Sequence, residues 1–201
     1  FSIAIIIAYQ HVLNQFLNHF SGLCIIRAFG HAGTTTSYGN IFEDLYPGFQ
    51  QAIINQGTRF YFGMAYKNLY EIEPDYIKKR AIFLPICLPD RFFRESNTWV
   101  GDQEVLFFVC PAINDSQYYH NIYEQFKYNF RGFNYIIGGK QLKKVNDSTV
   151  IGTVDRETFD SYLRHCKVMF YHSEEPLHLH YHPLEAMGFG LPVIFMKNVL
   201  L

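Results

Sequence analysis

Runs of apolar residues recur along the chain, and most of them lack the alternation of polar and apolar positions that marks a half-exposed strand. Runs that are apolar on both faces are typical of parallel sheets that helices cover on each side. We predict nine strands in this chain, at residues 3–8, 23–29, 59–65, 81–86, 105–110, 135–137, 149–151, 168–171 and 193–196.

Helical patterns separate several of these runs. Apolar residues repeat at helical spacing over residues 12–20 and 122–130, and Asp155 is placed to cap a helix that runs to about Cys166. The alternation of strands and helices predicts an α/β fold with two Rossmann-like, doubly wound parallel-sheet domains.

One polar segment without periodicity, from Cys87 to Glu104, marks a change of composition. We therefore predict a first domain over residues 1–90, a linker over 91–103 and a second domain over 104–201. The chain has no initiator Met, opens inside a predicted strand and stops just after another. We expect a fragment of a longer protein, with both sheets truncated.

Composition narrows the class of protein. Hydrophobic residues make up 49% of the chain and charged residues 17%, which predicts a globular protein with a large core. A net charge of -1 provides no basic surplus for nucleic-acid binding. The four cysteines form no CxxC pair, so we expect a reduced, cytoplasmic compartment. The first apolar run ends at Gln10, too early for a membrane span.

The stretch from Tyr171 to Met196 predicts a strand, a polar turn, a short helix and another strand. Pro183 fits the first helical position, Glu185 then falls in the first turn, and Gly188, Gly190 and Pro192 are expected to end the helix. Ligands of open α/β sheets bind at the carboxyl ends of the strands, so we expect the site at this turn. Glu185 would also be ordinary as a first-turn acid that the helix dipole favours.

An ordered set of segments resembles a known family: LPICLPDRFF, EVLFFVCP, YIIGG, VIGTVDRETFDSYLRHCKVMFYHS and HPLEAMGFGLPVI. From about Val105 to Met196 the chain resembles the nucleotide-sugar domain of retaining, group-1 glycosyltransferases of the GT-B fold. That family carries a glutamate, seven residues, and then Glu-Ala-Met-Ala-x-Gly-x-Pro-Val-Ile. Residues 1 to about 90 would be the later part of its acceptor-side domain.

The resemblance implies that Glu185 accepts hydrogen bonds from the two ribose hydroxyls of the nucleotide, with His182 and Leu184 beside it in the donor site. The N–H groups at the start of the same helix would face the diphosphate. Leu177 stands where the family has its other glutamate. Glu174 and Glu175 lie just upstream, where either could reach the sugar or be solvated, and we take Glu175 as the catalytic candidate.

The family usually places a basic pair after the first strand of this domain, but Cys110 is followed by Pro-Ala-Ile-Asn, without Arg or Lys. Lys140, at a later strand end, is a candidate for the missing charge, although a solvated surface lysine is the simpler interpretation. Residues 30–36 form a glycine-bearing loop that could border the acceptor or be an ordinary βα loop.

Three histidines, His178, His180 and His182, alternate in the predicted turn and could aim their imidazoles to one side, as zinc ligands do. Transferases of the resembled family generally hold no metal at the leaving group. We therefore favour donor-facing or structural histidines and expect no metal and no cofactor, the nucleotide sugar being a substrate.

The resemblance implies a hexosyltransferase-type glycosyltransferase of polysaccharide biosynthesis, which moves a sugar from a nucleotide-sugar donor to a glycan or lipid-linked acceptor with retention. A lipid-linked acceptor would fit a peripheral association with a membrane. Two alternatives remain open: a non-catalytic nucleotide-sugar-binding module, and a nucleotide-sugar epimerase of the same fold. The base, the sugar, the acceptor and the oligomeric state do not follow from the sequence.

Overall fold

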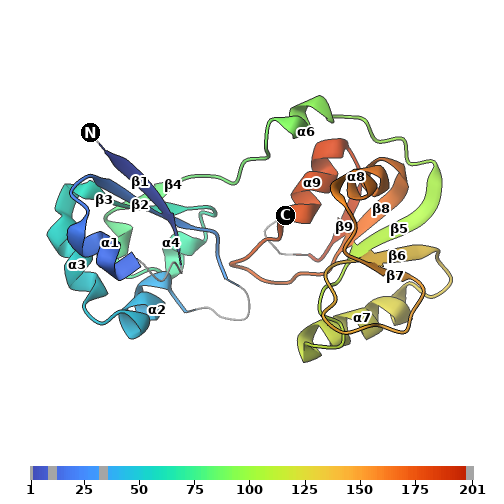
Figure 1. Cartoon of the computed structure of the whole chain (residues 1–201), viewed down its shortest axis with the longest axis horizontal. Helices are drawn as coiled ribbons and strands as arrows, with labels where there is room; N and C mark the ends of the chain where they lie inside the picture. Colours follow the sequence, from blue (N-terminus) through green and yellow to red (C-terminus); the bar gives the residue numbers. More distant parts are fainter. Residues whose placement is uncertain (1, 9–12, 32–35, 198–201) are drawn as a thin grey trace. The chain divides into compact units, whose positions relative to one another are not determined.

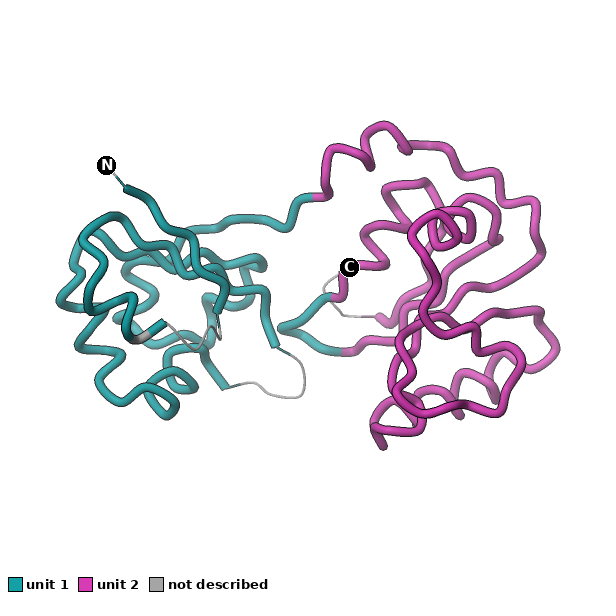
Figure 2. Tube along the Cα trace, in the orientation of Figure 1, with its two compact units in different colours: residues 1–87, 175–179, 200 teal, residues 88–174, 180–199, 201 magenta. Residues whose placement is uncertain are grey.

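The computed structural model describes residues 2–8, 13–31 and 36–197, and the chain folds into two compact units. The first unit contains the described residues up to Cys87 together with Glu175–Leu179, and the second contains Leu88–Glu174 and residues 180–197, as the two colours of Figure 2 show. A short piece of the second half of the sequence thus belongs to the first unit.

A four-stranded parallel sheet forms the first unit, in the order β1-β2-β3-β4. Its strands are β1 (Ile3–Ile7), β2 (Leu23–Ala28), β3 (Phe60–Met64) and β4 (Ala81–Phe83). Its helices are α1 (Leu13–His19), α2 (Tyr38–Leu45), α3 (Phe49–Gln56), α4 (Leu69–Ile72) and α5 (Asp75–Lys78), with a 3₁₀ turn at Gly57–Arg59.

The helices of this unit gather on one face of the sheet, where Figure 1 shows α1, α2 and α3. Each connection advances to the next strand in the same direction, and right-handed crossovers then all fall on one side. Phe60 and Phe62 are fully buried on that side, whereas Ile3 and Ile5 of the edge strand are 65% exposed. In the described part of the chain this sheet therefore carries helices on one face, whereas a doubly wound sheet carries them on both.

Leu177 completes the core of the first unit although it follows the strand β8 of the second. Its side chain is 5% exposed and packs among the buried residues of the first unit. Gly30 has a φ of +78°, and a Cβ there would lie 1.6 Å from the carbonyl oxygen of Leu177. Tyr66 donates a hydrogen bond from its hydroxyl to the carbonyl of Leu179, at 3.3 Å. Only glycine at position 30 allows this close approach.

A five-stranded parallel sheet forms the second unit, in the order β7-β6-β5-β8-β9. Its strands are β5 (Gln103–Val109), β6 (Tyr135–Gly138), β7 (Val150–Gly152), β8 (Cys166–Tyr171) and β9 (Val193–Phe195). Its helices are α6 (Arg91–Arg94), α7 (Gln117–Asn129), α8 (Arg156–His165) and α9 (Tyr181–Phe189).

Helices cover both faces of this second sheet. Figure 1 shows α7 on one face, and α8 and α9 on the other. Neighbouring residues of β5 divide between them, because side chains of a strand alternate: Phe108 stacks on Phe126 of α7, and Phe107 packs edge-on against Phe159 of α8. The long apolar run of β5 thus reflects burial on two sides.

The structure confirms an α/β fold with two parallel sheets, and all nine predicted strands form with small shifts of their ends. The predicted helices correspond to α1, α7 and α8, and Asp155 caps α8 by accepting a hydrogen bond from the Thr158 N–H at 2.8 Å. Val12 lies outside the described residues. Residues 91–103, expected as a linker, contain α6 and contribute Phe92 and Trp99 to the core of the second unit.

The domain limits, the GT-B pairing of the two units and the truncation of the chain stay predictions. None of the described helices combines the length and the apolar character that a membrane span requires. The four cysteines form no disulfide with one another. Cys87 is exposed, and burial raises the pKa of the Cys110 and Cys166 thiols to about 12.

Candidate functional site

The strand order of the second unit creates a point where the chain reverses its direction of travel across the sheet. The chain moves from β5 outward to β6 and β7, and then crosses over to β8 and β9 on the other side of β5. The connections that leave β5 and β8 therefore run in opposite directions, away from the gap between these two strands. In open α/β sheets the crevice beside the carboxyl ends of such strands is where ligands bind. We take this edge as the candidate site.

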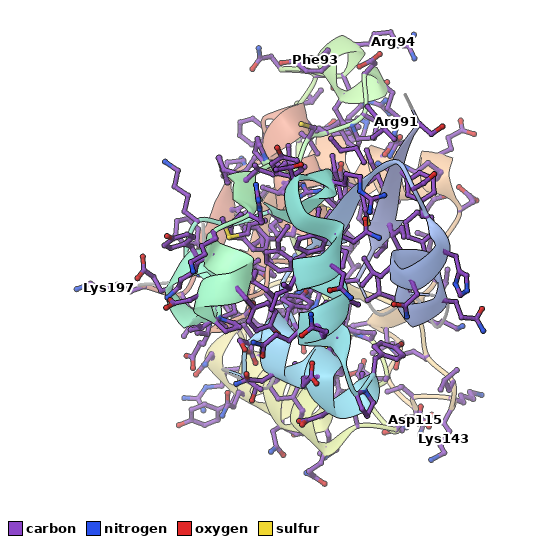
Figure 3. The ribbon with its side chains drawn as sticks, turned by 90° about the vertical axis from the view of Figure 1, so that its left-hand side faces the viewer. Arg91, Phe93, Arg94, Asp115, Lys143 and Lys197 are labelled. Atoms are coloured by element: carbon purple, nitrogen blue, oxygen red, sulfur yellow. The ribbon has the colours of Figure 1, made fainter. Side chains whose placement is uncertain are left out.

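The loops that follow β5 and β6 are joined at this edge by Gln141. Its amide donates hydrogen bonds to the carbonyls of Cys110 at 2.8 Å and Gly139 at 3.1 Å, and its oxygen accepts one from the Ile113 N–H at 2.9 Å. Lys143 forms an ion pair with Asp115 at 3.2 Å, and Figure 3 shows the two side by side. These contacts fix the loop that leads from β5 into α7.

A cavity of about 390 Å³ lies beside that loop, lined by Ile113, Asn114, Asp115, Ser116, Gln117 and His120. It includes the start of α7, whose N-cap Ser116 accepts a hydrogen bond from the Tyr119 N–H at 3.5 Å. The cavity provides space at the carboxyl end of β5.

Helix α9 begins two residues earlier than the sequence predicts. Its N-cap is His180, so Pro183 occupies the third helical position, and Glu185 occupies the fifth and lies outside the first turn. Proline fits there because the first four N–H groups of a helix have no intrahelical partner. The expected end of the helix is confirmed in part: Gly190 ends it with a φ of +92°, whereas Gly188 lies inside it.

Glu185 is almost buried, with an exposed fraction of 8%, and it lies in a cluster of ion pairs. Its Oε1 accepts hydrogen bonds from Arg156 Nη1 at 2.9 Å and from Arg91 Nη2 at 3.3 Å. Asp160 pairs with the same two arginines. Arg91 lies on the inner side of α6, whereas Phe93 and Arg94 lie on its outer side (Figure 3). Three separate helices thus position one carboxylate.

Burial raises the pKa of the Glu185 carboxyl, and the two arginines oppose this effect only in part. Both arginines contact Oε1. Within the described ranges, Oε2 of Glu185 receives no hydrogen bond, so it retains its full capacity to accept one. The carboxylate is therefore held in place by one oxygen while the other is available to a ligand hydroxyl.

The other predicted site residues divide between the two units. Leu184 is half-buried in α9, next to Glu185. Lys140 is exposed after β6; its carbonyl accepts a hydrogen bond from the Ala112 N–H at 2.9 Å, and its ammonium forms no ion pair with the described residues. Glu175 belongs to the first unit, whereas Glu185, Leu184, His182 and Lys140 belong to the second.

The histidines of the turn separate in the same way. His178 lies in the first unit, and His180 and His182 lie in the second. His182 is the second residue of α9, and its buried Nε2 has no hydrogen-bond partner among the described residues. Among the residues that the structure describes, no three His, Cys, Asp or Glu side chains are arranged to hold a metal ion.

Several residues at the site escape sequence reasoning. Arg91 and Arg156 hold Glu185, and Asp155 before Arg156 offers only a capping signal. His172, directly after β8, is buried beside His180, with 6.0 Å between ring centroids. In the sequence, only its position directly after a predicted strand marks His172 as a candidate site residue. Of the loop at 30–36, residues 32–35 lie outside the described part of the chain.

Comparisons with known proteins add no identification. No protein-family model matches the chain, and no curated protein resembles it closely enough to count as a match.

Proposed function

We propose that this chain is the donor-binding part of a glycosyltransferase that moves a sugar from a nucleotide-sugar donor to a glycan or lipid-linked acceptor with retention. The strand order of the second unit carries the proposal. The reversal between β5 and β8 brings the segment that resembles the family motif to the edge where ligands of open α/β sheets bind.

Glu185 supports a role in nucleotide binding. A ribose presents two neighbouring hydroxyls, and charge-assisted hydrogen bonds to a carboxylate are among the strong ones. Oε2 is uncommitted among the described residues, and Arg91 and Arg156 keep the carboxylate in one orientation through Oε1.

The test compares donors that differ by one hydroxyl. We expect Glu185→Ala to weaken binding of a ribonucleotide sugar by ~1 to 3 kcal/mol, the cost of a lost charge-assisted bond. The same variant should lose less affinity for the 2′-deoxy donor, which keeps only one of the two hydroxyls. Glu157→Ala, an exposed acid in the first turn of α8, is the matched control and should change neither affinity.

This comparison separates ribose recognition from damage to the fold, because damage would weaken both donors equally. An unchanged affinity of Glu185→Ala for the ribonucleotide sugar would remove Glu185 from the site. Incubation with UDP-, GDP- and ADP-sugars and an acceptor panel then tests turnover. Nucleotide release with an α-linked product from an α-linked donor is expected of a retaining transferase.

A non-catalytic nucleotide-sugar-binding module is the second candidate. Two observations favour it: Leu177, at the position of the family's other glutamate, is buried in the core of the first unit, and Ala112 follows β5 where the family has a cation. Tight donor binding without turnover on any acceptor would select this candidate. Conversion of a donor into its epimer without nucleotide release would instead indicate an epimerase.

A further inference from the structure

A groove lies where strands β5, β6 and β7 begin, on the edge of the second sheet opposite the candidate site. Its volume is about 520 Å³, and all its lining residues belong to the second unit. Volumes of roughly 300 to 1,000 Å³ are typical of small-molecule sites. We call it the amino-edge groove and define it by four apolar and two cationic lining residues: Val105, Phe133, Tyr135, Ile136, Lys127 and Arg131.

The apolar part of the lining comes from two strands and from the turn that follows α7. Val105 of β5 and Tyr135 and Ile136 of β6 are half-buried. Phe133, in the turn between α7 and β6, is 65% exposed. Apolar side chains that remain in water at a concave surface indicate a binding site, because covering them is favourable.

The charge of this groove is positive. Lys127 and Arg131 line it, and none of its described lining residues is an acid. Asp147 lies 2.7 Å from Lys127 and neutralises it. Arg131 forms no ion pair or hydrogen bond with the described residues, and its Cζ lies 4.9 Å from the ring centroid of Tyr128. A guanidinium stacked on a ring still presents the N–H groups at its edge to an anion.

The groove is separate from the candidate site, although both lie in the second unit. The strands of this sheet are parallel, so their amino ends and their carboxyl ends lie on opposite edges. Strand β5 has seven residues, which span roughly 20 Å. A small ligand in the groove therefore does not overlap a ligand at the carboxyl ends.

We propose that the amino-edge groove binds a small amphipathic organic anion. The apolar body of this ligand covers Phe133 and Tyr135, and its single acidic group pairs with Arg131. A carboxylate or a phosphate suits a guanidinium because two parallel N–H bonds can form. Lys127 is already neutralised by Asp147, so the groove offers one free positive charge and suits one acidic group. This inference does not depend on the proposed function.

The experiment uses two probes that differ in one acidic group. Anilinonaphthalene sulfonate is an aromatic anion that fluoresces strongly in apolar surroundings, and phenylnaphthylamine has the same aromatic body without the sulfonate. We expect the whole chain to bind the sulfonate at one saturable site, and more tightly than the neutral amine. UDP-glucose should not displace the sulfonate, because its proposed site lies on the other edge of the sheet.

Variants assign the two parts of the groove. Arg131→Gln should weaken sulfonate binding about fivefold, as for loss of an exposed ion pair, and leave amine binding unchanged. Phe133→Ser should weaken both probes, by up to about tenfold. Arg94→Gln is the matched control, because Arg94 is also exposed but lies on the outer side of α6 (Figure 3), and it should change neither affinity. An unchanged urea transition of Trp99 fluorescence verifies the fold of each variant.

Three results would overturn this inference. Sulfonate binding that Arg131→Gln leaves unchanged rejects the pairing with Arg131. Displacement of the sulfonate by UDP-glucose places the probe at the candidate site and rejects the groove, without affecting the proposed function. The absence of saturable binding of either probe rejects a small-molecule site at this edge.

Discussion

Replacement of Leu177 offers the sharpest test of how the two units share the chain. Leu177 is 5% exposed in the core of the first unit, and the proposed glycosyltransferase function would call for a glutamate at this position. Leu177→Ala removes most of a buried side chain, and Leu177→Glu places a carboxylate there. If Leu177 fills the core as described, both variants destabilise the first unit, and Leu177→Glu does not raise transferase turnover.

The expected magnitudes follow from burial. Leucine-to-alanine changes in cores cost ~2 to 5 kcal/mol, and the lower end applies to Leu177 because a loop segment can partly collapse into the space. About 2 kcal/mol corresponds to roughly thirtyfold faster hydrogen exchange in the core strands. A buried, unpaired carboxylate costs several kcal/mol more, so Leu177→Glu should expel the segment altogether.

Hydrogen exchange measured by mass spectrometry on peptides that cover β3 reports the first unit. The single tryptophan, Trp99, reports the second unit by fluorescence. We expect faster exchange in β3 and an unchanged Trp99 transition in urea. Leu142→Ala is the matched control, because that leucine is 71% exposed. Normal exchange in β3 of Leu177→Glu would refute the placement of Leu177 in this core.

Two further predictions concern charge and thiol chemistry in the second unit. Burial opposes ionisation of Asp147, but hydrogen bonds from Lys127 at 2.7 Å, from Tyr123 at 2.5 Å and from Thr149 outweigh it and lower the pKa of its carboxyl. Because this pKa is lower in the folded state than its unfolded value of about 3.9, the ionised carboxylate stabilises the folded state at any pH above that value. Asp147→Asn should therefore lower the free energy of unfolding in urea at neutral pH by ~1 to 2 kcal/mol. The deficit should shrink as the pH falls below that value, and a deficit that stays constant in acid would contradict the ion pair. In thiol titration of the folded chain, Cys87 should react quickly, and reaction of a second cysteine before unfolding would contradict the burial of Cys24, Cys110 and Cys166.

Much of the fold could be predicted because burial on two faces leaves a direct trace in sequence. Each of the nine strands appears as an apolar run, and α7 and α8 have clear periodicity or a capping residue. Helices α3 to α6 leave no such trace, and α2 offers only its N-cap Ser37, which accepts a hydrogen bond from the Asn40 N–H at 3.1 Å. Helix α2, Tyr38–Leu45, is followed within three residues by Pro47 and Gly48, and α4, α5 and α6 are single turns.

The candidate site was only partly predictable. Glu185 could be selected because its segment follows a strand directly, but its partner Arg91 lies 94 positions earlier, and no local pattern joins them. The start of α9 was misplaced because proline is acceptable anywhere in the first turn, and sequence alone does not distinguish the first position from the third. Leu177 is apolar in a polar turn, which is consistent with burial but does not reveal in which unit.

The place of Leu177 also determines when the first unit can finish folding during synthesis. The ribosome makes the chain from the N-terminus toward the C-terminus. The core formed by residues up to Cys87 therefore lacks one of its side chains until Leu177 has been made. About 90 residues separate the two points, which takes roughly 5 to 20 s at ordinary rates of translation. Strands β5 to β8 are all made within that interval. The first unit is thus the first to begin folding, but it cannot be complete before most of the second unit exists.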